Sequence, residues 1–481
     1  MNTTFLFRKV TPLVALLGLG LTACQPDLEK DFGASKGSAD FTRYIALGNS
    51  LTAGYSDGGL YLEGQLNSYP NILANQFRLA GGGEFNQPLF TEAQSNGSGY
   101  LRLAGIVNGA PVTANVTTNL AIRSLNPTLY TRYDGRVDNL GVPGIRLSDI
   151  QTPGYGSTGG NAYFERITPT TAQTQTYFQR AKAEAATATF FSNWLGNNDV
   201  LGYATAGGAA STITNTDTFR LKNNRIINVL TANGAKGIVA TIPDVTNVPF
   251  FTTVGPSFRA TLDAKQVPSA APFVYTTGLL APGQANTRTS ATVAAIRDAS
   301  GTGTLLLTLT ASPYLGLYGQ PTGKYWRDFY QQAKPSLPAT IPNLTVFLTL
   351  LQVDTTKAFG QSTGNPFPST LVLDATEQTS VRNATTAFNT AIINKANEKG
   401  LAVFDANSFF SRVAATGFVT NGVSNTAGFV SGNLFSLDGV HPTPRGYAVV
   451  ANEMIRAINI QYGASIPQIN PNDYRGVKFP Q

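Results

Sequence analysis

The chain has little with which to bind a transition metal or to form a covalent crosslink. Its 481 residues include one cysteine, Cys24, and one histidine, His441. A single cysteine excludes an intramolecular disulfide in any compartment. A zinc site of the usual kind needs three or four ligands drawn largely from cysteine and histidine, so a metalloenzyme is disfavoured and we expect no metal or other cofactor.

Charged residues are also scarce, at 13% of the chain, about half their share in an average soluble protein. Glycine, threonine, asparagine and alanine are abundant instead, as in exported proteins with long ordered loops. The formal net charge is +7 without a dense basic run, so nucleic acid is not an expected partner. Hydrophobic residues make up 42%, which is enough for a sizeable core.

The first residues, MNTTFLFRKVTPLVALLGLGLTAC, have the parts of a secretory signal peptide spanning residues 1–23. Arg8 and Lys9 precede an apolar run from Leu13 to Leu21 that is too short to span a membrane. The letters LTAC resemble the bacterial lipobox, which implies lipid attachment to Cys24 after cleavage. An ordinary signal peptide before a free cysteine is the alternative. We expect an exported lipoprotein held at the outer membrane or the cell surface by its lipid anchor.

Residues 24–40 are polar, mixed in charge and without an apolar period, and predict a flexible tether before a single domain over 41–481. Within that domain, short apolar runs predict buried parallel strands. The runs are Tyr44–Gly48, Val137–Val142, Ala188–Gly196, Gly237–Val245 and Leu401–Ala406.

Helical patterns over residues 216–234 and 377–400 precede the fourth and fifth runs, and each closes on a glycine that can cap a helix. Strands that alternate with helices predict an α/β fold, with a central parallel sheet of about five strands between two helical layers.

Two insertions, over about residues 56–136 and 249–369, are too long for simple crossovers and are rich in glycine, proline, threonine and asparagine. Loops of that length are usually lids or binding loops, and plain decoration is the alternative. The second insertion also holds aromatic residues that can line a substrate site or simply pack a loop. They are Tyr314, Tyr318, Tyr325, Trp326, Phe329 and Tyr330.

The strongest chemical signal is the segment around the only histidine, SLDGVHPTPRGYAVVANEMIRAIN. A lone histidine is more often structural than catalytic, but Asp438 lies three residues before His441. A carboxylate there can accept the imidazole Nδ1–H, set the tautomer and stabilise the imidazolium. Thr443 as N-cap and Pro444 as first residue place this pair just before a helix. Apolar positions with helical spacing would pack that helix on the sheet, at Tyr447, Val450, Ala451, Met454 and Ile458.

Ser50, in the segment ALGNSLTAGY, is a nucleophile that such a base would activate, because a serine hydroxyl alone reacts poorly at neutral pH. It follows an apolar run and a glycine turn at the carboxyl edge of the predicted sheet. After the second run, Gly144 offers an N–H to a developing oxyanion, and after the third either Asn197 or Asn198 offers an amide. Together with the Asp/His pair, these groups make a complete acyl-transfer site.

These four blocks resemble those of the SGNH (GDSL-type) hydrolases, in the family's order. GNSL places Ser50 as nucleophile, NLGVPG matches Gly144 to the oxyanion-hole glycine, and GNND selects Asn198 as the amide donor. The D-x-x-H block is met by Asp438 and His441. The resemblance implies a flavodoxin-like three-layer α/β/α fold and esterase or lipase activity through an acyl-serine intermediate. It also implies that the Ser50 N–H is a further oxyanion donor.

The resemblance covers elements between about residues 41 and 460, and the two insertions match nothing in it. Asn49 stands where most members have aspartate. Asparagine keeps the shape and an acceptor oxygen but loses the charge, and we expect Ser50 to stay active beside it. The implied substrate is an ester, either an acyl lipid or an acylated glycan. The alternative is a surface lipoprotein that binds glycan or lipid without catalysis, although the intact set of site residues argues against it.

Overall fold

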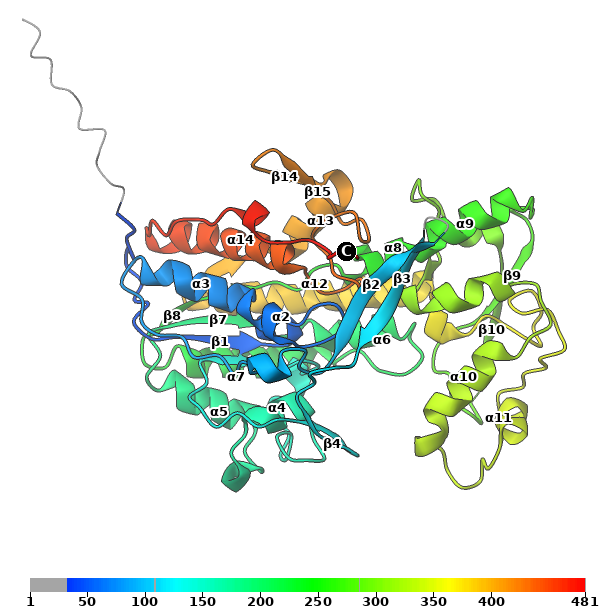
Figure 1. Cartoon of the computed structure of the whole chain (residues 1–481), viewed down its shortest axis with the longest axis horizontal. Helices are drawn as coiled ribbons and strands as arrows, with labels where there is room; N and C mark the ends of the chain where they lie inside the picture. The colour runs from blue at the N-terminus through cyan, green and yellow to red at the C-terminus, as the bar shows by residue number, and fades with distance from the viewer. Residues whose placement is uncertain (1–32, 108–109, 285, 481) are drawn as a thin grey trace, which may run out of the picture.

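The computed structural model describes residues 33–107, 110–284 and 286–480 (Figure 1). The predicted leader, the lipidation site Cys24 and the first part of the predicted tether lie outside these residues. In the described part of the chain, no helix combines the length and the apolar character needed to cross a membrane.

A five-stranded parallel sheet lies at the centre of the molecule (Figure 1). Its strands are β1 (Tyr44–Gly48), β6 (Asn139–Gly141), β7 (Phe190–Trp194), β8 (Lys236–Ala240) and β13 (Ala402–Phe404). They lie in the order β13-β8-β7-β1-β6, and every neighbouring pair is parallel. The five predicted strands are therefore confirmed. All except β1 are shorter than the apolar run that predicted them. Some apolar residues of those runs, such as Val142 and Ile242, are buried in the turns that follow the strands.

Helices flank this sheet. On one face, α3 (Tyr69–Arg78) packs beside α14 (Pro444–Tyr462), and on the other α5 (Tyr177–Ala185) and α12 (Ala375–Glu398) pack against α7 (Thr216–Leu230) (Figure 1). The main core lies between these helices and the sheet. This arrangement confirms a mixed α/β fold built on a parallel sheet.

The helix after the histidine begins as predicted. Thr443 is the N-cap of α14 and its side chain accepts the N–H of Gly446, and Pro444 is the first helical residue. The five predicted core positions of this helix are all buried. Burial of that face anchors the loop that carries His441 to the sheet.

The predicted glycine caps have two outcomes. After α12, Gly400 has φ +63° and the N–H of Leu401 bonds to the carbonyl of Ala396, which ends the helix in a left-handed turn. The cap predicted for the other helix was wrong, because α7 ends at Leu230 with Thr231 as its C-cap and Gly234 lies in the turn beyond.

Both predicted insertions contain regular elements. The first holds α2 (Leu62–Leu66), α3 and two hairpins, which are β2 (Tyr100–Val107) with β3 (Ala110–Val116) and β4 (Ile122–Leu125) with β5 (Thr128–Tyr130). The second holds α8 (Pro249–Thr252), α9 (Val254–Ala264), the hairpin β9 (Pro272–Thr276) and β10 (Arg288–Thr292), α10 (Lys324–Ala333) and α11 (Leu344–Leu350).

The second insertion forms a lobe with its own hydrophobic core at one end of the molecule (Figure 1). The aromatic residues of that segment belong to this core: Tyr325, Trp326 and Tyr330 are buried, while Tyr314, Tyr318 and Phe329 pack against it. The sequence left open whether these side chains line a substrate site or pack a loop. In the structure they pack the core of the lobe.

The folded body begins earlier than predicted. Ala39 is buried, and the N–H of Ser38 bonds to the carbonyl of Tyr462 at the end of α14. A Cβ at Gly37 would lie 2.2 Å from that same carbonyl oxygen, so the chain passes the helix end closely. Residues 37–40 are therefore packed on the domain, where the sequence predicted a flexible tether up to residue 40.

Candidate active site

Ser50 lies at the carboxyl end of the sheet's β1. The strand ends at Gly48, Asn49 caps the short helix α1 (Ser50–Ala53), and Ser50 is its first residue. A Cβ at Gly48 would lie 1.9 Å from the hydroxyl oxygen of Thr52, so only glycine allows this tight turn from strand to helix. The turn aims the Ser50 hydroxyl at the imidazole of His441, with 2.8 Å between Oγ and Nε2.

His441 joins Ser50 to Asp438. Its Nδ1 lies 2.8 Å from Asp438 Oδ2, on the side of the ring opposite the serine. When the neutral imidazole donates Nδ1–H to the carboxylate, its Nε2 carries a lone pair that accepts the Ser50 proton. Ser50, His441 and Asp438 thus form one chain of hydrogen bonds, although Ser50 and His441 lie 391 positions apart in the sequence.

The carboxylate of Asp438 is surrounded by donors. Oδ1 accepts the N–H groups of Val440 and His441, each at 2.8 Å, and Oδ2 accepts the N–H of Gly58 at 2.8 Å. Burial raises the pKa of Asp438, but the interactions with His441 and the backbone donors outweigh it and hold the pKa at about 2. Asp438 is therefore ionised throughout the neutral range and stabilises a positive charge on His441.

The loops that carry Gly144 and Asn198 follow β6 and β7, the two strands that lie on either side of β1. Gly144 has φ +84° in the loop after β6, and Asn198 begins α6 (Asn198–Thr205) after β7. Asn198 Nδ2 donates to the carbonyl of Ile145 at 2.9 Å, which uses one amide hydrogen and leaves the other. Among the described residues, the N–H groups of Ser50 and Gly144 donate to no protein acceptor. These two N–H groups and one hydrogen of the Asn198 amide therefore make no bond within the described residues.

Asn197, the other candidate amide, takes a different position. Its Nδ2 lies 3.4 Å from the carbonyl of Trp194 on its own strand, and its side chain is buried. Asn198, by contrast, bonds across to the loop that carries Gly144. Of these two amides, only Asn198 bonds to the Gly144 loop in the described part of the chain.

Asp199 holds the glycine loop in place, a role that the sequence reading did not assign. Its carboxylate accepts the N–H groups of Leu147 at 2.6 Å and Ser148 at 3.1 Å, and the hydroxyl of Thr214 at 2.7 Å. Burial raises the pKa of Asp199 above its ordinary value, and these donors offset only part of that rise. The sequence signal for this role was Asp199 itself, the last residue of the GNND block, because a carboxylate that is buried there needs hydrogen-bond donors nearby.

The start of the first insertion clamps the acid–base loop. Asp57 donates its N–H to Ser436 Oγ at 2.8 Å and accepts the N–H of Leu437 on Oδ1 at 3.0 Å. Ser56 Oγ donates to the carbonyl of Pro442 at 2.9 Å. Asp57 adopts φ +52° because it is the first central residue of a tight turn, in which Ser56 and Gly59 exchange backbone hydrogen bonds. No sequence signal pointed to this contact, because its halves lie about 380 positions apart.

Tyr55 packs against the imidazole. The two ring centroids are 4.7 Å apart at an angle of 48°, and the Tyr55 hydroxyl donates to the carbonyl of Gly58 at 2.6 Å. Burial, followed by the negative charge of Asp438, raises the pKa of Tyr55 to about 12. The phenol is therefore neutral at working pH and limits the rotation of His441.

Asn49 caps the nucleophile helix through Oδ1, which accepts the N–H of Leu51 at 3.0 Å. Its Nδ2 is buried without a partner in the described part of the chain.

An Asn49→Asp change keeps this cap but buries a charge, so we expect kcat/KM on a p-nitrophenyl ester to stay within about tenfold of wild type. Activity higher than wild type by orders of magnitude would show that Asn49 cripples the site.

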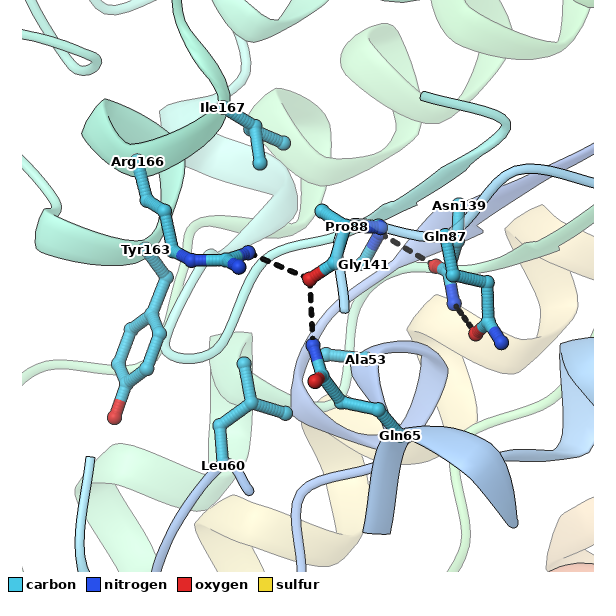
Figure 2. A pocket seen from close by; sticks show the side chains of 10 residues that line it. All are labelled: Ala53, Leu60, Gln65, Gln87, Pro88, Asn139, Gly141, Tyr163, Arg166 and Ile167. Carbon is cyan, nitrogen blue, oxygen red and sulfur yellow. Dashed lines mark hydrogen bonds between the residues drawn. The ribbon is translucent and has the colours of Figure 1, made fainter. Parts of the chain in front are cut away.

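A small cavity is lined in part by Ala53, the last residue of α1 (Figure 2). Arg166 Nη1 and Gln65 Nε2 both donate to the carbonyl of Pro88, at 2.6 and 2.8 Å, and Asn139 Nδ2 donates to Gln87 Oε1 at 3.0 Å. Most of these polar groups bond to one another, and Arg166 Nε is buried without a partner in the described part of the chain. None of the predicted site residues lines the cavity. The bonds from Asn139 to Gln87 Oε1 and to the carbonyl of Thr52 join β6 to the first insertion and to α1.

Among the residues that the structure describes, no group of three or more histidine, cysteine, aspartate and glutamate side chains could hold a metal ion.

Comparison with known proteins gives little. No protein-family model matches the chain, and no curated protein matches it. One crystal structure aligns with 87% of this chain and 95% of its own, at 11% sequence identity and a TM-score of 0.31. A TM-score that low does not establish a shared fold.

Proposed function

We propose that this protein is a serine esterase that cleaves carboxylic esters through an acyl-serine intermediate. The observation that carries the proposal is the position of His441, with Nε2 2.8 Å from Ser50 Oγ and Nδ1 2.8 Å from Asp438 Oδ2. A structural histidine has no need of a serine at a sharp strand end on one side and an ionised carboxylate on the other.

In the first half of the reaction, Ser50 Oγ attacks the ester carbonyl while its proton moves to His441 Nε2. The carbonyl oxygen becomes an oxyanion, and Asp438 stabilises the imidazolium. His441 then gives the proton to the ester oxygen, the bond from carbonyl carbon to that oxygen breaks, and the alcohol leaves. The acyl group stays on Ser50.

In the second half, His441 takes a proton from water, whose oxygen attacks the acyl carbon, and returns that proton to Ser50 Oγ as the carboxylic acid leaves. In both halves the N–H groups of Ser50 and Gly144 and the Asn198 amide bind the oxyanion. One such donor typically contributes about 3 kcal/mol to lowering the barrier.

We propose further that the fold is the flavodoxin-like three-layer fold of the SGNH hydrolases. Support comes from the placement of the four blocks, which follow β1, β6 and β7 and precede α14, at the carboxyl edge of one parallel sheet. Open α/β sheets bind their ligands at that edge.

The proposal includes export as a lipoprotein anchored to a membrane through Cys24, acting on an acyl lipid or an acylated glycan. It rests on the basic and apolar leader and the LTAC letters of the sequence. Mass spectrometry of the mature amino terminus tests the anchor, and an unmodified Cys24 would contradict it.

A fluorophosphonate probe tests the catalytic proposal directly. Such a probe reacts with an activated serine hydroxyl, so we expect it to label Ser50 covalently, as located by peptide mass spectrometry. His441→Ala should abolish the labelling because the hydroxyl loses its base. A folded wild-type protein that stays unlabelled would favour the binding lipoprotein instead.

A further inference from the structure

A chain of polar side chains connects the loop of Asp438 to the carboxyl-terminal segment. Its members are Asp57, Tyr61, Arg475 and Glu63. We infer that Asp57 is a positioning residue of the proposed reaction, which holds Asp438 in the orientation that supports His441. Tyr61 and Arg475 in turn hold Asp57. The inference rests on the proposed esterase function and gives the start of the first insertion a role in it.

The turn that carries Asp57 reaches both oxygens of the Asp438 carboxylate. Gly58, the next residue, donates its N–H to Oδ2 at 2.8 Å. Ser436 Oγ accepts the N–H of Asp57 at 2.8 Å, so its own proton is available for Asp438 Oδ1, which lies 3.2 Å away. Two of the hydrogen bonds that orient Asp438 therefore depend on where this turn lies.

The side chain of Asp57 fixes the position of the turn. Oδ1 accepts the N–H of Leu437, the residue before Asp438, at 3.0 Å, and Oδ2 accepts the hydroxyl of Tyr61 at 2.8 Å. Asp57 is only 5% exposed, so water does not readily replace a bond that is lost there. Burial raises the pKa of Asp57. The Leu437 and Tyr61 bonds, followed by the charge of Arg475, offset part of that rise.

Tyr61 is itself held in one orientation. Its buried ring stacks on Tyr100, with 4.1 Å between the centroids and 21° between the planes. Its hydroxyl accepts a hydrogen bond from Arg475 Nη2 at 3.2 Å, and Arg475 is fixed by two bonds to the carboxylate of Glu63 at 2.6 and 2.8 Å. A hydroxyl that accepts from a guanidinium keeps its own proton for another acceptor, which here is Asp57.

Loosening this chain should lower kcat without changing KM. The rate depends on how well Asp438 supports the imidazolium of His441, and a misplacement of about 1 Å in such a group can cost on the order of a hundredfold. Asp57 and Tyr61 are buried, so neither contacts the substrate. A residue that acts only in the chemical step changes kcat and leaves the binding of the substrate as it was.

Tyr61→Phe is the smallest test, because it removes the hydroxyl bond to Asp57 and keeps the ring on Tyr100. The substrate is p-nitrophenyl butyrate, and kcat is counted per active site after exhaustive fluorophosphonate labelling. We expect kcat to fall about three- to tenfold with KM within about twofold. Asp57→Ala should lower kcat by about 30-fold or more, and Asp57→Asn, which keeps an oxygen for the Leu437 N–H, should recover at least about a third of the wild-type value.

Tyr462→Phe is the matched control. It also removes a buried tyrosine hydroxyl, which donates to the carbonyl of Gly237 at 2.7 Å, but at the end of α14 opposite the loop of His441. It should lower the free energy of unfolding and leave kcat per active site within about twofold of wild type. Counting active sites separates the two roles, because a merely structural change reduces the number of sites and leaves the rate at each of them unchanged.

The outcomes separate this inference from the esterase proposal. A wild-type kcat per active site in Tyr61→Phe, or an equal fall in Tyr462→Phe, would overturn the positioning role alone. The same holds if KM rises while kcat stays constant. If Asp57→Ala folds poorly, Tyr61→Phe and Asp57→Asn decide the question. No hydrolysis by the wild-type protein together with an unlabelled Ser50 would overturn the esterase proposal and with it the role of Asp57.

Discussion

Ser50→Ala is expected to lower kcat on a p-nitrophenyl ester by roughly 10⁴- to 10⁶-fold, the range seen when a serine nucleophile is removed. Without Oγ no acyl-enzyme forms, and His441 Nε2 loses its only protein partner among the described residues. The three oxyanion donors remain, so the residual rate should still exceed the uncatalysed one.

The same variant should fold normally. Among the described residues, the Ser50 side chain makes one hydrogen bond, to His441, so the free energy of unfolding should change by no more than about 1 kcal/mol. Ser380→Ala is the matched control, because Ser380 is exposed on α12 and its loss should leave activity unchanged. A Ser50→Ala protein that retains more than a tenth of wild-type activity would remove Ser50 from the proposal.

The central sheet could be predicted because its signal is local. Buried parallel strands are covered on both faces, so their sequences are continuous apolar runs such as Tyr44–Gly48. The site followed from the sheet, since parallel strands place their carboxyl ends at one edge. Ser50 and the loops of Gly144 and Asn198 could thus be brought together without knowing any long-range contact.

The supports of the site could not be predicted in the same way. The bonds from Asp57 to Ser436 and Leu437 join segments about 380 positions apart, and nothing in the letters around Asp57 marks it as a partner of the histidine loop. The lobe formed by the second insertion could not be predicted either, because its core joins short segments that show no regular apolar period. In these regions the contacts, rather than local propensity, decide the structure.

Asp438→Asn is expected to lower kcat by about 10³- to 10⁴-fold while leaving Ser50 and His441 in place. An amide that points its NH₂ at His441 Nδ1 donates where the carboxylate accepts, so the imidazole carries its proton on Nε2. That nitrogen then cannot take the proton of Ser50. Fluorophosphonate labelling should slow by a similar factor, which a merely structural role for Asp438 would not produce in a folded protein.

The variant should also change the pH dependence of stability. The pKa of Asp438 lies at about 2 in the folded protein and 3.8 in its ordinary state, so the ionised side chain stabilises the fold above about pH 4 by roughly 2 kcal/mol. This stabilisation is lost as the pH falls toward 2. Denaturant unfolding should therefore show a deficit for Asp438→Asn at pH 6 that shrinks at pH 3.

Asp217→Asn provides the comparison for both measurements, because that carboxylate is 82% exposed on α7 and should affect neither activity nor the pH profile. If Asp438→Asn kept full activity, His441 would hold the reactive tautomer without the carboxylate. The hydrogen bond from Nδ1 would then serve only to position the loop before α14, and the proposed proton transfer would need another group to stabilise the imidazolium.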